Sequence, residues 1–81
     1  MKEITQKEWY KFLDEKRREL VGIVKWNDGS QIYYQNGKWH RTDGPAIIRF
    51  DNSVEYWIHG TKTTKEGQEL YYSMMKLKGL I

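Results

Sequence analysis

Two stretches of this chain repeat one another at a fixed offset. The segment from Asp28 to Gly37 aligns with the segment from Asp51 to Gly60, and the two share an Asp-x-Ser turn, a Tyr followed by Tyr or Trp, and a closing Gly. Each copy therefore has the pattern of strand, tight turn, strand, turn. Such a hairpin cannot bury its apolar side alone. The repeat predicts two hairpins that pair into one sheet and are covered by other elements.

Helical periodicity flanks the repeats on both sides. Thr5 and Glu8 have the spacing of a capping box. One helical face at spacings of three and four residues then carries Trp9, Phe12, Leu13, Lys16 and Leu20. Near the other end, apolar residues recur at four, three and four residues, which is one stripe of a helix that we expect to pack onto the sheet. These residues are Leu70, Met74, Leu77 and Ile81. Gly79 is well placed as a left-handed stop.

The expected architecture is α+β, in a single domain spanning residues 1–81. It consists of an N-terminal helix over residues 5–20, a four-stranded antiparallel β-meander over residues 22–60 built from the two hairpin repeats, and a C-terminal helix over residues 64–79. The chain has no cysteine, so disulfides and cysteine-based zinc sites are excluded, whereas 15% of its residues are aromatic. The core is therefore expected to be built on rings.

Composition also narrows the functional classes. We expect no cofactor and no metal, because two histidines alone cannot supply a structural zinc site. No apolar run approaches the roughly 20 residues that span a bilayer, so a cytoplasmic protein without a membrane partner is expected. The net charge of +3 permits contact with nucleic acid without requiring it.

A family resemblance lies between the two repeats. The stretch from Asn36 to Ala46 closely resembles the repeat Asn-Gly-x-x-His-Arg-x-Asp-Gly-Pro-Ala, which is seen in small proteins of bacteriophages and large DNA viruses and is loosely similar to MORN-type β-hairpin repeats. The resemblance covers roughly residues 28–67, and the second copy lacks the His-Arg and Pro-Ala pairs. It implies a phage-type origin, and small phage proteins often act by binding a host protein.

Three residues of this motif, His40, Arg41 and Asp43, form a candidate site. In the functional interpretation, Arg41 supplies a fork of donors for an anion or a protein partner, and His40 titrates near neutrality. In the structural interpretation, Asp43 accepts backbone hydrogen bonds in its own turn and Arg41 ties the loop down. The second interpretation is favoured, because turn residues at fixed offsets in a repeat usually serve the repeat.

A second candidate site is enzymatic. A small metal-independent ribonuclease would need a carboxylate base, a histidine acid and an arginine that stabilises the phosphorane. His40, Glu55, His59 and one of Arg41 or Arg49 could supply these groups. Most basic chains of this length contain such residues on strands, so this hypothesis stays an alternative.

The third candidate site is a face of the sheet. Alternation along the strands suggests one face with Ile32, Tyr34, Val54, Tyr56 and Ile58. The other face would carry Tyr33, Glu55 and Trp57, with Lys25, Arg49 and Trp39 nearby. If both helices cover the first face, the second is an aromatic and basic surface of the kind found at protein interfaces and on binders of single-stranded nucleic acid.

The leading hypothesis is a non-enzymatic bacteriophage accessory protein, monomeric or homodimeric, that binds and modulates a host protein, as an inhibitor of a defence or transcription component. The expected partner-binding residues are Tyr33, Trp39, His40, Arg41, Asp43, Arg49, Glu55 and Trp57. The alternatives are a single-stranded nucleic-acid-binding module and the ribonuclease.

Overall fold

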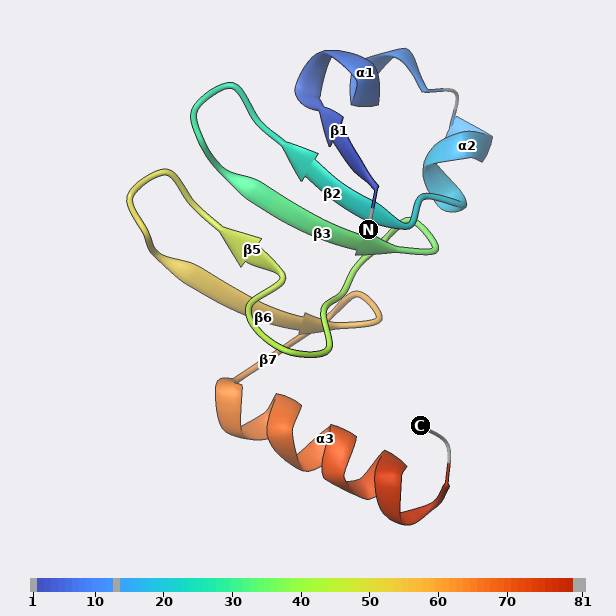
Figure 1. Ribbon diagram of the computed structural model, residues 1–81, viewed down its shortest axis with the longest axis vertical. Coiled ribbons are helices and arrows are strands. Elements are labelled where there is room, and N and C mark those ends of the chain that lie inside the picture. Colours follow the sequence, from blue (N-terminus) through green and yellow to red (C-terminus); the bar gives the residue numbers. More distant parts are fainter. Residues whose placement is uncertain (1, 13, 80–81) are drawn as a thin grey trace.

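The computed structural model describes residues 2–12 and 14–79, and its architecture is α+β (Figure 1). The described strands form a mixed seven-stranded sheet in the order β1-β2-β3-β5-β6-β7, with β4 paired to β3. The strands are β1 (Glu3–Thr5), β2 (Gly22–Lys25), β3 (Gln31–Gln35), β4 (Lys38–Trp39), β5 (Ile47–Ile48), β6 (Val54–Ile58) and β7 (Thr61–Thr63). The helices are α1 (Gln6–Lys11), α2 (Asp14–Arg18) and α3 (Lys65–Leu77).

The expected four-stranded antiparallel meander is wrong. β1 joins the sheet as a parallel neighbour of β2, with Ile4 paired to Val24. In addition, β4 and β7 follow the turns that close the two repeats, so each repeat has three strands instead of two. We call β2, β3 and β4 the first unit, and β5, β6 and β7 the second unit. The units join where β5 pairs with β3, alongside β4.

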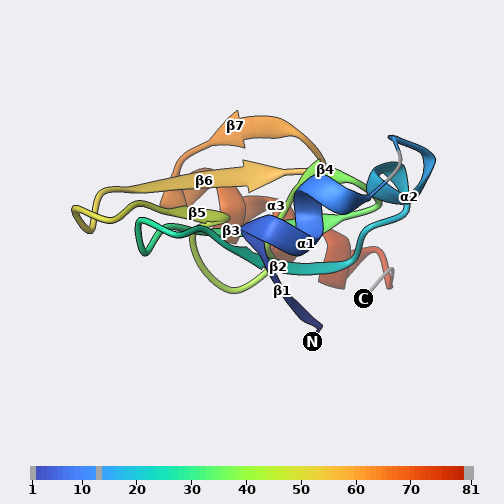
Figure 2. The same ribbon diagram turned by 90° about the horizontal axis from the view of Figure 1, so that it is seen from above.

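The internal repeat is confirmed at the level of the backbone. The alignment of Asp28 with Asp51 places β6 on β3 from end to end, and it places the start of β7 on β4. The turn at Asn36 and Gly37 and the turn at His59 and Gly60 all have positive φ, as tight turns between twisted strands require. The β2–β3 and β5–β6 hairpin turns project side by side from one end of the sheet (Figure 2).

The single helix expected over residues 5–20 is also wrong. The capping box of Thr5 and Glu8 is present, but α1 ends at Lys11 and α2 follows as a separate short helix. The segment between β1 and β2 connects two parallel strands. A straight helix over the whole expected range would extend about 24 Å, whereas a strand as short as β1 covers about 10 Å. The connection therefore has to fold back on itself. Leu13, assigned to the expected helix, lies outside the described residues.

Arg17 of α2 connects the two short helices by contacts with α1. Its guanidinium lies 4.2 Å from the centre of the Trp9 ring and donates hydrogen bonds to the carbonyl oxygens of Trp9 and Tyr10, each at 3.3 Å. These carbonyls belong to the last turn of α1, and the carbonyls of a last helical turn lack the regular donors four residues on. The Trp9 carbonyl also accepts a hydrogen bond from the backbone N–H of Phe12. A cation in this position also offsets the negative end of the helix dipole.

The register of the strands decides which side chains share a face, because directly paired residues point the same way. Ile32 pairs with Ile47, and Ile47 pairs with Glu55, so these three residues lie on one face, here called face A. By alternation along β3 and β6, Tyr34 and Trp57 also lie on face A. Face B is the opposite side of the sheet.

The expected division of side chains between the faces is therefore wrong. Tyr33 and Tyr56 lie on face B, whereas Glu55, Trp57 and Tyr34 share face A. The two units keep one continuous register, but their apolar residues alternate in opposite phase. As a result, the first unit presents its apolar side on face A and the second unit presents its apolar side on face B.

The helices follow this division. The main core lies between face A of the first unit and the helices α1 and α2, which sit beside β1 and β2 at one end of the molecule (Figure 1). Its buried residues are Ile4, Leu20, Val24 and Tyr34, and the rings of Trp9, Phe12, Trp26 and Trp39 pack against them. α3 lies at the opposite end of the molecule and packs against β6 of the second unit.

α3 meets the rest of the molecule through a different stripe from the expected one. It begins after the N-cap Thr64, and Gly79 has the expected left-handed backbone just beyond its end. The inward residues follow helical spacing and are Gln68, Tyr71, Tyr72 and Met75. The described part of the expected stripe, Leu70, Met74 and Leu77, faces solvent. Ile81, its fourth member, lies outside the described residues.

Across the described ranges, 2–12 and 14–79, no helix combines the length and the apolar character needed to cross a bilayer.

Candidate functional site

The expected partner-binding residues separate into two groups on different parts of the molecule. Trp39, Arg49, Glu55 and Trp57 gather together with Lys62, which the sequence analysis missed; we call these five residues the Trp57 cluster. The other expected residues belong to the loop over residues 40–45 and to its contact with Tyr33.

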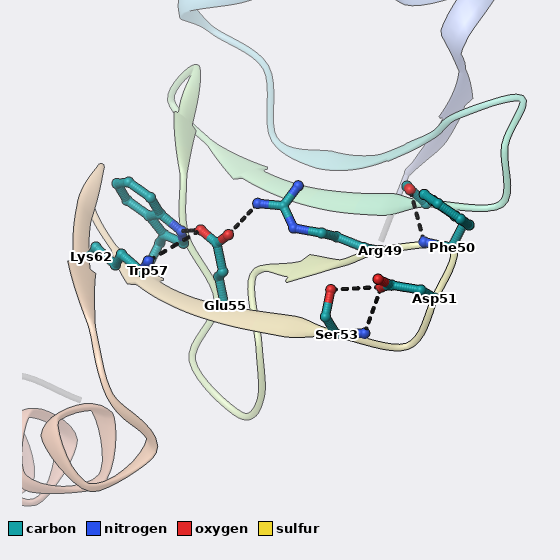
Figure 3. Close-up of polar contacts among 8 residues, drawn as sticks. Arg49, Phe50, Asp51, Ser53, Glu55, Trp57 and Lys62 are labelled. Atoms are coloured by element: carbon teal, nitrogen blue, oxygen red, sulfur yellow. Dashed lines mark hydrogen bonds and ion pairs between the residues drawn. The ribbon is translucent and has the colours of Figure 1, made fainter.

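Glu55 lies at the centre of the Trp57 cluster (Figure 3). Its carboxylate forms an ion pair with the Arg49 guanidinium and accepts a hydrogen bond of 3.0 Å from the indole Nε1–H of Trp57. Lys62 Nζ lies 3.9 Å from the same carboxylate. The Trp57 ring in turn meets the Trp39 ring edge-on, with 4.8 Å between the ring centres. The cluster is thus held by several contacts that converge on one acid.

The cluster is charged and open to water. The side chains of Arg49 and Lys62 are 46% and 63% exposed, whereas that of Glu55 is 20% exposed. The hydrogen bond from Arg49 lowers the pKa of the Glu55 carboxyl from its usual value, and the indole N–H of Trp57 lowers it further. Glu55 is therefore ionised at neutral pH and keeps both cations in place.

The internal repeat explains why this part of face A is polar. Each residue of the cluster on β6 and β7 has an aligned counterpart in the first unit. Glu55 occupies the position of Ile32, Trp57 that of the buried Tyr34, and Lys62 that of Trp39. Glu55 and Lys62 thus carry charges at two positions where the first unit packs apolar side chains under α1 and α2. Face A of the second unit is therefore exposed to water.

The loop over residues 40–45 is tied down by hydrogen bonds. Arg41 donates to Asp43 at 2.9 Å and to the Pro45 carbonyl at 3.3 Å, and its guanidinium stacks 4.1 Å from the centre of the Tyr33 ring. The buried Gln68 of α3 donates to the carbonyls of Arg41 and Gly44. Arg41 therefore ties the loop down as the structural interpretation expects, whereas Asp43 accepts a side-chain hydrogen bond from Arg41 in place of the expected backbone hydrogen bonds.

His40 is buried, and both of its ring nitrogens are engaged. Nδ1 accepts a hydrogen bond of 2.9 Å from the backbone N–H of His59, so it carries no proton. Nε2 lies 3.1 Å from the Tyr72 hydroxyl and is therefore the protonated nitrogen of a neutral ring. Burial lowers the pKa of His40, and the neighbouring His59, whose ring is stacked at 4.1 Å, lowers it further. His40 acts here as a structural joint between the loop, the β6–β7 turn and α3.

A pH dependence of stability follows. The folded protein holds His40 neutral with a lowered pKa, while the unfolded chain takes up a proton near its ordinary value of about 6.5. Stability from this group is fully present above about pH 6.5 and is lost as the pH falls below it, by about 1.4 kcal/mol for each unit by which the pKa is lowered. Urea unfolding at about pH 7.5 and about pH 5 measures this loss.

His40→Gln is the matched variant for that measurement. It keeps His59 and every carboxylate, and the pKa values of Glu3, Asp28, Asp51 and Glu55 are lowered, so these acids titrate below the chosen interval. The variant should be less stable at the higher pH but should lose much less on acidification. Equal losses in both proteins would contradict the assignment of the effect to His40.

The residues of the ribonuclease hypothesis form two sets of contacts, in which His40 stacks on His59 and Glu55 pairs with Arg49. Both nitrogens of His40 face the backbone of His59 and the hydroxyl of Tyr72, whereas the Glu55 carboxylate is bonded to Arg49 and Trp57 on face A. In the part of the chain that the structure describes, no group of three or more acidic, histidine or cysteine side chains is placed to hold a metal ion.

Sequence reasoning missed three residues that organise these regions: Lys62, Gln68 and Tyr72. Lys62 could have been found by carrying the repeat one strand further, since the alignment places it on Trp39. Gln68 gave no such signal, because a polar residue on a helix is ordinarily a surface residue. The ring of Tyr72 favours packing, but the sequence does not show that its hydroxyl meets His40.

Comparison with known proteins gives no match: no protein-family model, no curated protein and no solved structure is similar to this chain.

Proposed function

We propose that this protein is a non-enzymatic binding module that engages a protein partner through the Trp57 cluster. Trp and Arg are the residues that most often carry the binding energy of protein interfaces. The observation that supports this proposal most directly is the exposed cluster itself, in which Arg49, Trp57 and Lys62 are already fixed by Glu55. Side chains that are ordered before binding lose less entropy in the complex.

The proposed biological setting rests on the sequence. The resemblance of residues 36–46 to a repeat of bacteriophage and large DNA virus proteins supports an accessory protein that acts in the cytoplasm of a host cell. The partner in this proposal is a host protein of the defence or transcription machinery, which the module inhibits. Tyr33 and the loop over residues 40–45 belong to the supporting framework of the module and are left out of the docking surface.

Trp57→Ala is expected to abolish stable partner binding. Loss of a central tryptophan costs at least about 2 kcal/mol, so the dissociation constant should rise about 30-fold or more. Immobilised protein would first capture partners from a bacterial lysate for identification by mass spectrometry. The purified partner would then be titrated against the wild type and the variant.

The matched control is Tyr33→Ala, which removes a half-buried ring from face B of the same sheet. It should bind the partner as the wild type does, and circular dichroism should show that both variants are folded. Unchanged binding by folded Trp57→Ala protein would show that the cluster is not the docking surface. Loss of binding in Tyr33→Ala alone would assign the surface to face B.

Single-stranded nucleic acid is the second candidate ligand, favoured by the proximity of two Trp rings to Arg49 and Lys62. Titration with oligo(dT) separates the two functions. A nucleic-acid binder would lose affinity linearly in a double-logarithmic plot against salt concentration as counterions are released. Binding of this kind, weakened by Lys62→Ala, would replace the protein partner with nucleic acid.

A further inference from the structure

The outward side of α3 carries an exposed apolar stripe. Leu70, Met74 and Leu77 are 63%, 47% and 88% exposed. They do not hold the helix in place, because Gln68 and Tyr72 on the opposite side bond to the loop and to His40. The monomer therefore does not need this stripe in order to fold. Large exposed apolar patches commonly mark interaction sites.

The stripe has the spacing of a helix-pairing seam. Its residues are separated by four and then three positions, which is the heptad pattern by which two helices bury a shared line of side chains. A partner that fits this surface is therefore another amphipathic helix with apolar residues at the same spacing.

The charges along α3 indicate which helix this is. Its N-terminal half carries Glu66 and Glu69 beside Lys65 and is acidic on balance, whereas Lys76 and Lys78 lie at its C-terminal end. A second copy of α3 running antiparallel places the acidic half of each helix beside the basic end of the other. The two helix dipoles then also oppose each other favourably. A parallel copy would instead bring like charges together.

We propose that two copies of this chain form a homodimer through antiparallel pairing of their α3 helices. A two-fold axis near Met74 sets Leu70 of each copy against Leu77 of the other and brings the two Met74 side chains together. Such an interface is self-complementary, as closed dimers require. One short helix per copy gives an interface at the small end of the specific range, so the dimer is weak, with a dissociation constant of about micromolar order.

Sedimentation velocity over concentrations from about 1 µM to about 1 mM tests the proposal. The wild type should shift from monomer to dimer within this range. Leu77→Glu should raise the dissociation constant at least tenfold, and because Leu77 is almost fully exposed, the folded monomer tolerates the change. A wild type that stays monomeric throughout, or a Leu77→Glu variant that dimerises as the wild type does, would overturn the proposal.

Charge reversal tests the antiparallel orientation. The double variant E66K/E69K and the double variant K76E/K78E should each dimerise several-fold more weakly than the wild type, because each places like charges together across the two-fold axis. An equimolar mixture of the two should recover dimers, since the basic helix of one faces the mainly acidic helix of the other, in which Lys65 is the remaining cation. A mixture that remains monomeric would contradict antiparallel pairing. None of these substitutions touches the Trp57 cluster, so failure here is separate from failure of the proposed function.

Discussion

Replacing Gly37 with alanine is expected to lower the free energy of unfolding by about 3 kcal/mol or more. Gly37 has φ +76°, and a Cβ atom built there would lie 2.5 Å from the Arg17 carbonyl oxygen and 2.6 Å from the Arg18 Cα atom. Both neighbours are backbone atoms and cannot rotate away. The β3–β4 turn would have to leave α2 and lose the hydrogen bond from its N–H to the Leu20 carbonyl. Thermal unfolding should show a midpoint at least about 12 °C lower.

Gly29→Ala is the matched control for this measurement. Gly29 also has positive φ, at +95°, but a Cβ atom there meets nothing within 4 Å. This variant therefore carries the backbone strain without the collision and should lose only about 1 kcal/mol. The difference between the two variants isolates the close approach of the turn to α2. Equal losses would mean that strain alone accounts for the effect.

Gln68→Met is expected to destabilise the fold by about 2–4 kcal/mol. The Gln68 amide is buried and donates hydrogen bonds of 2.7 Å and 2.8 Å to the carbonyls of Arg41 and Gly44. Methionine has a similar volume but no donor, so two carbonyl groups would be left unpaired beneath α3. Urea unfolding measures the loss.

Lys65→Met, at an exposed position of the same helix, should change stability by less than about 0.5 kcal/mol. A similar effect of both substitutions would show that α3 is held by general packing instead of by the amide of Gln68.

The local features of this fold could be predicted because they depend on neighbouring residues. The Thr5–Glu8 capping box, the turns at Asn36-Gly37 and His59-Gly60, and the hairpin strands all follow from short spacings. β1 could not be predicted in this way. Its short segment pairs with a strand that begins only after α1 and α2, and the returning connection through these two helices is what makes the parallel pairing possible.

The wrong division of the sheet faces has a specific cause. Alternation shows that Tyr33 and Tyr34 point to opposite sides, but it does not tell which of them shares a side with Trp57. The prediction matched apolar residues to apolar residues and so placed Tyr34 with Tyr56. The repeat contained the correct answer, because its alignment maps Tyr34 onto Trp57. Register outweighed hydrophobic matching, since α1 and α2 cover the apolar side of the first unit and α3 covers that of the second.

The expected inward face of α3 failed for a related reason. Two stripes run along this helix at helical spacing, one with Leu70, Met74 and Leu77 and the other with Gln68 and Tyr72. Hydrophobicity favours the first stripe. The second is buried because its polar groups satisfy the loop and His40, and a hydrogen bond to a particular carbonyl leaves no periodic trace in a sequence. Lys62 of the Trp57 cluster differs in this respect, because the repeat alignment places it on Trp39.

The placement of helices on opposite faces, at opposite ends of the sheet, has a mechanical consequence. α1 packs against β1 and β2, and α3 packs against β6, so the two units are joined mainly by the ladder between β3 and β5 and by the contact of Trp39 with Trp57. The half that contains α1 and α2 has the main hydrophobic core, whereas the other half depends on the packing of α3 against β6. Force or denaturant that detaches α3 would unfold the second half while the first half stays folded. We therefore expect the two halves to unfold as separate cooperative units.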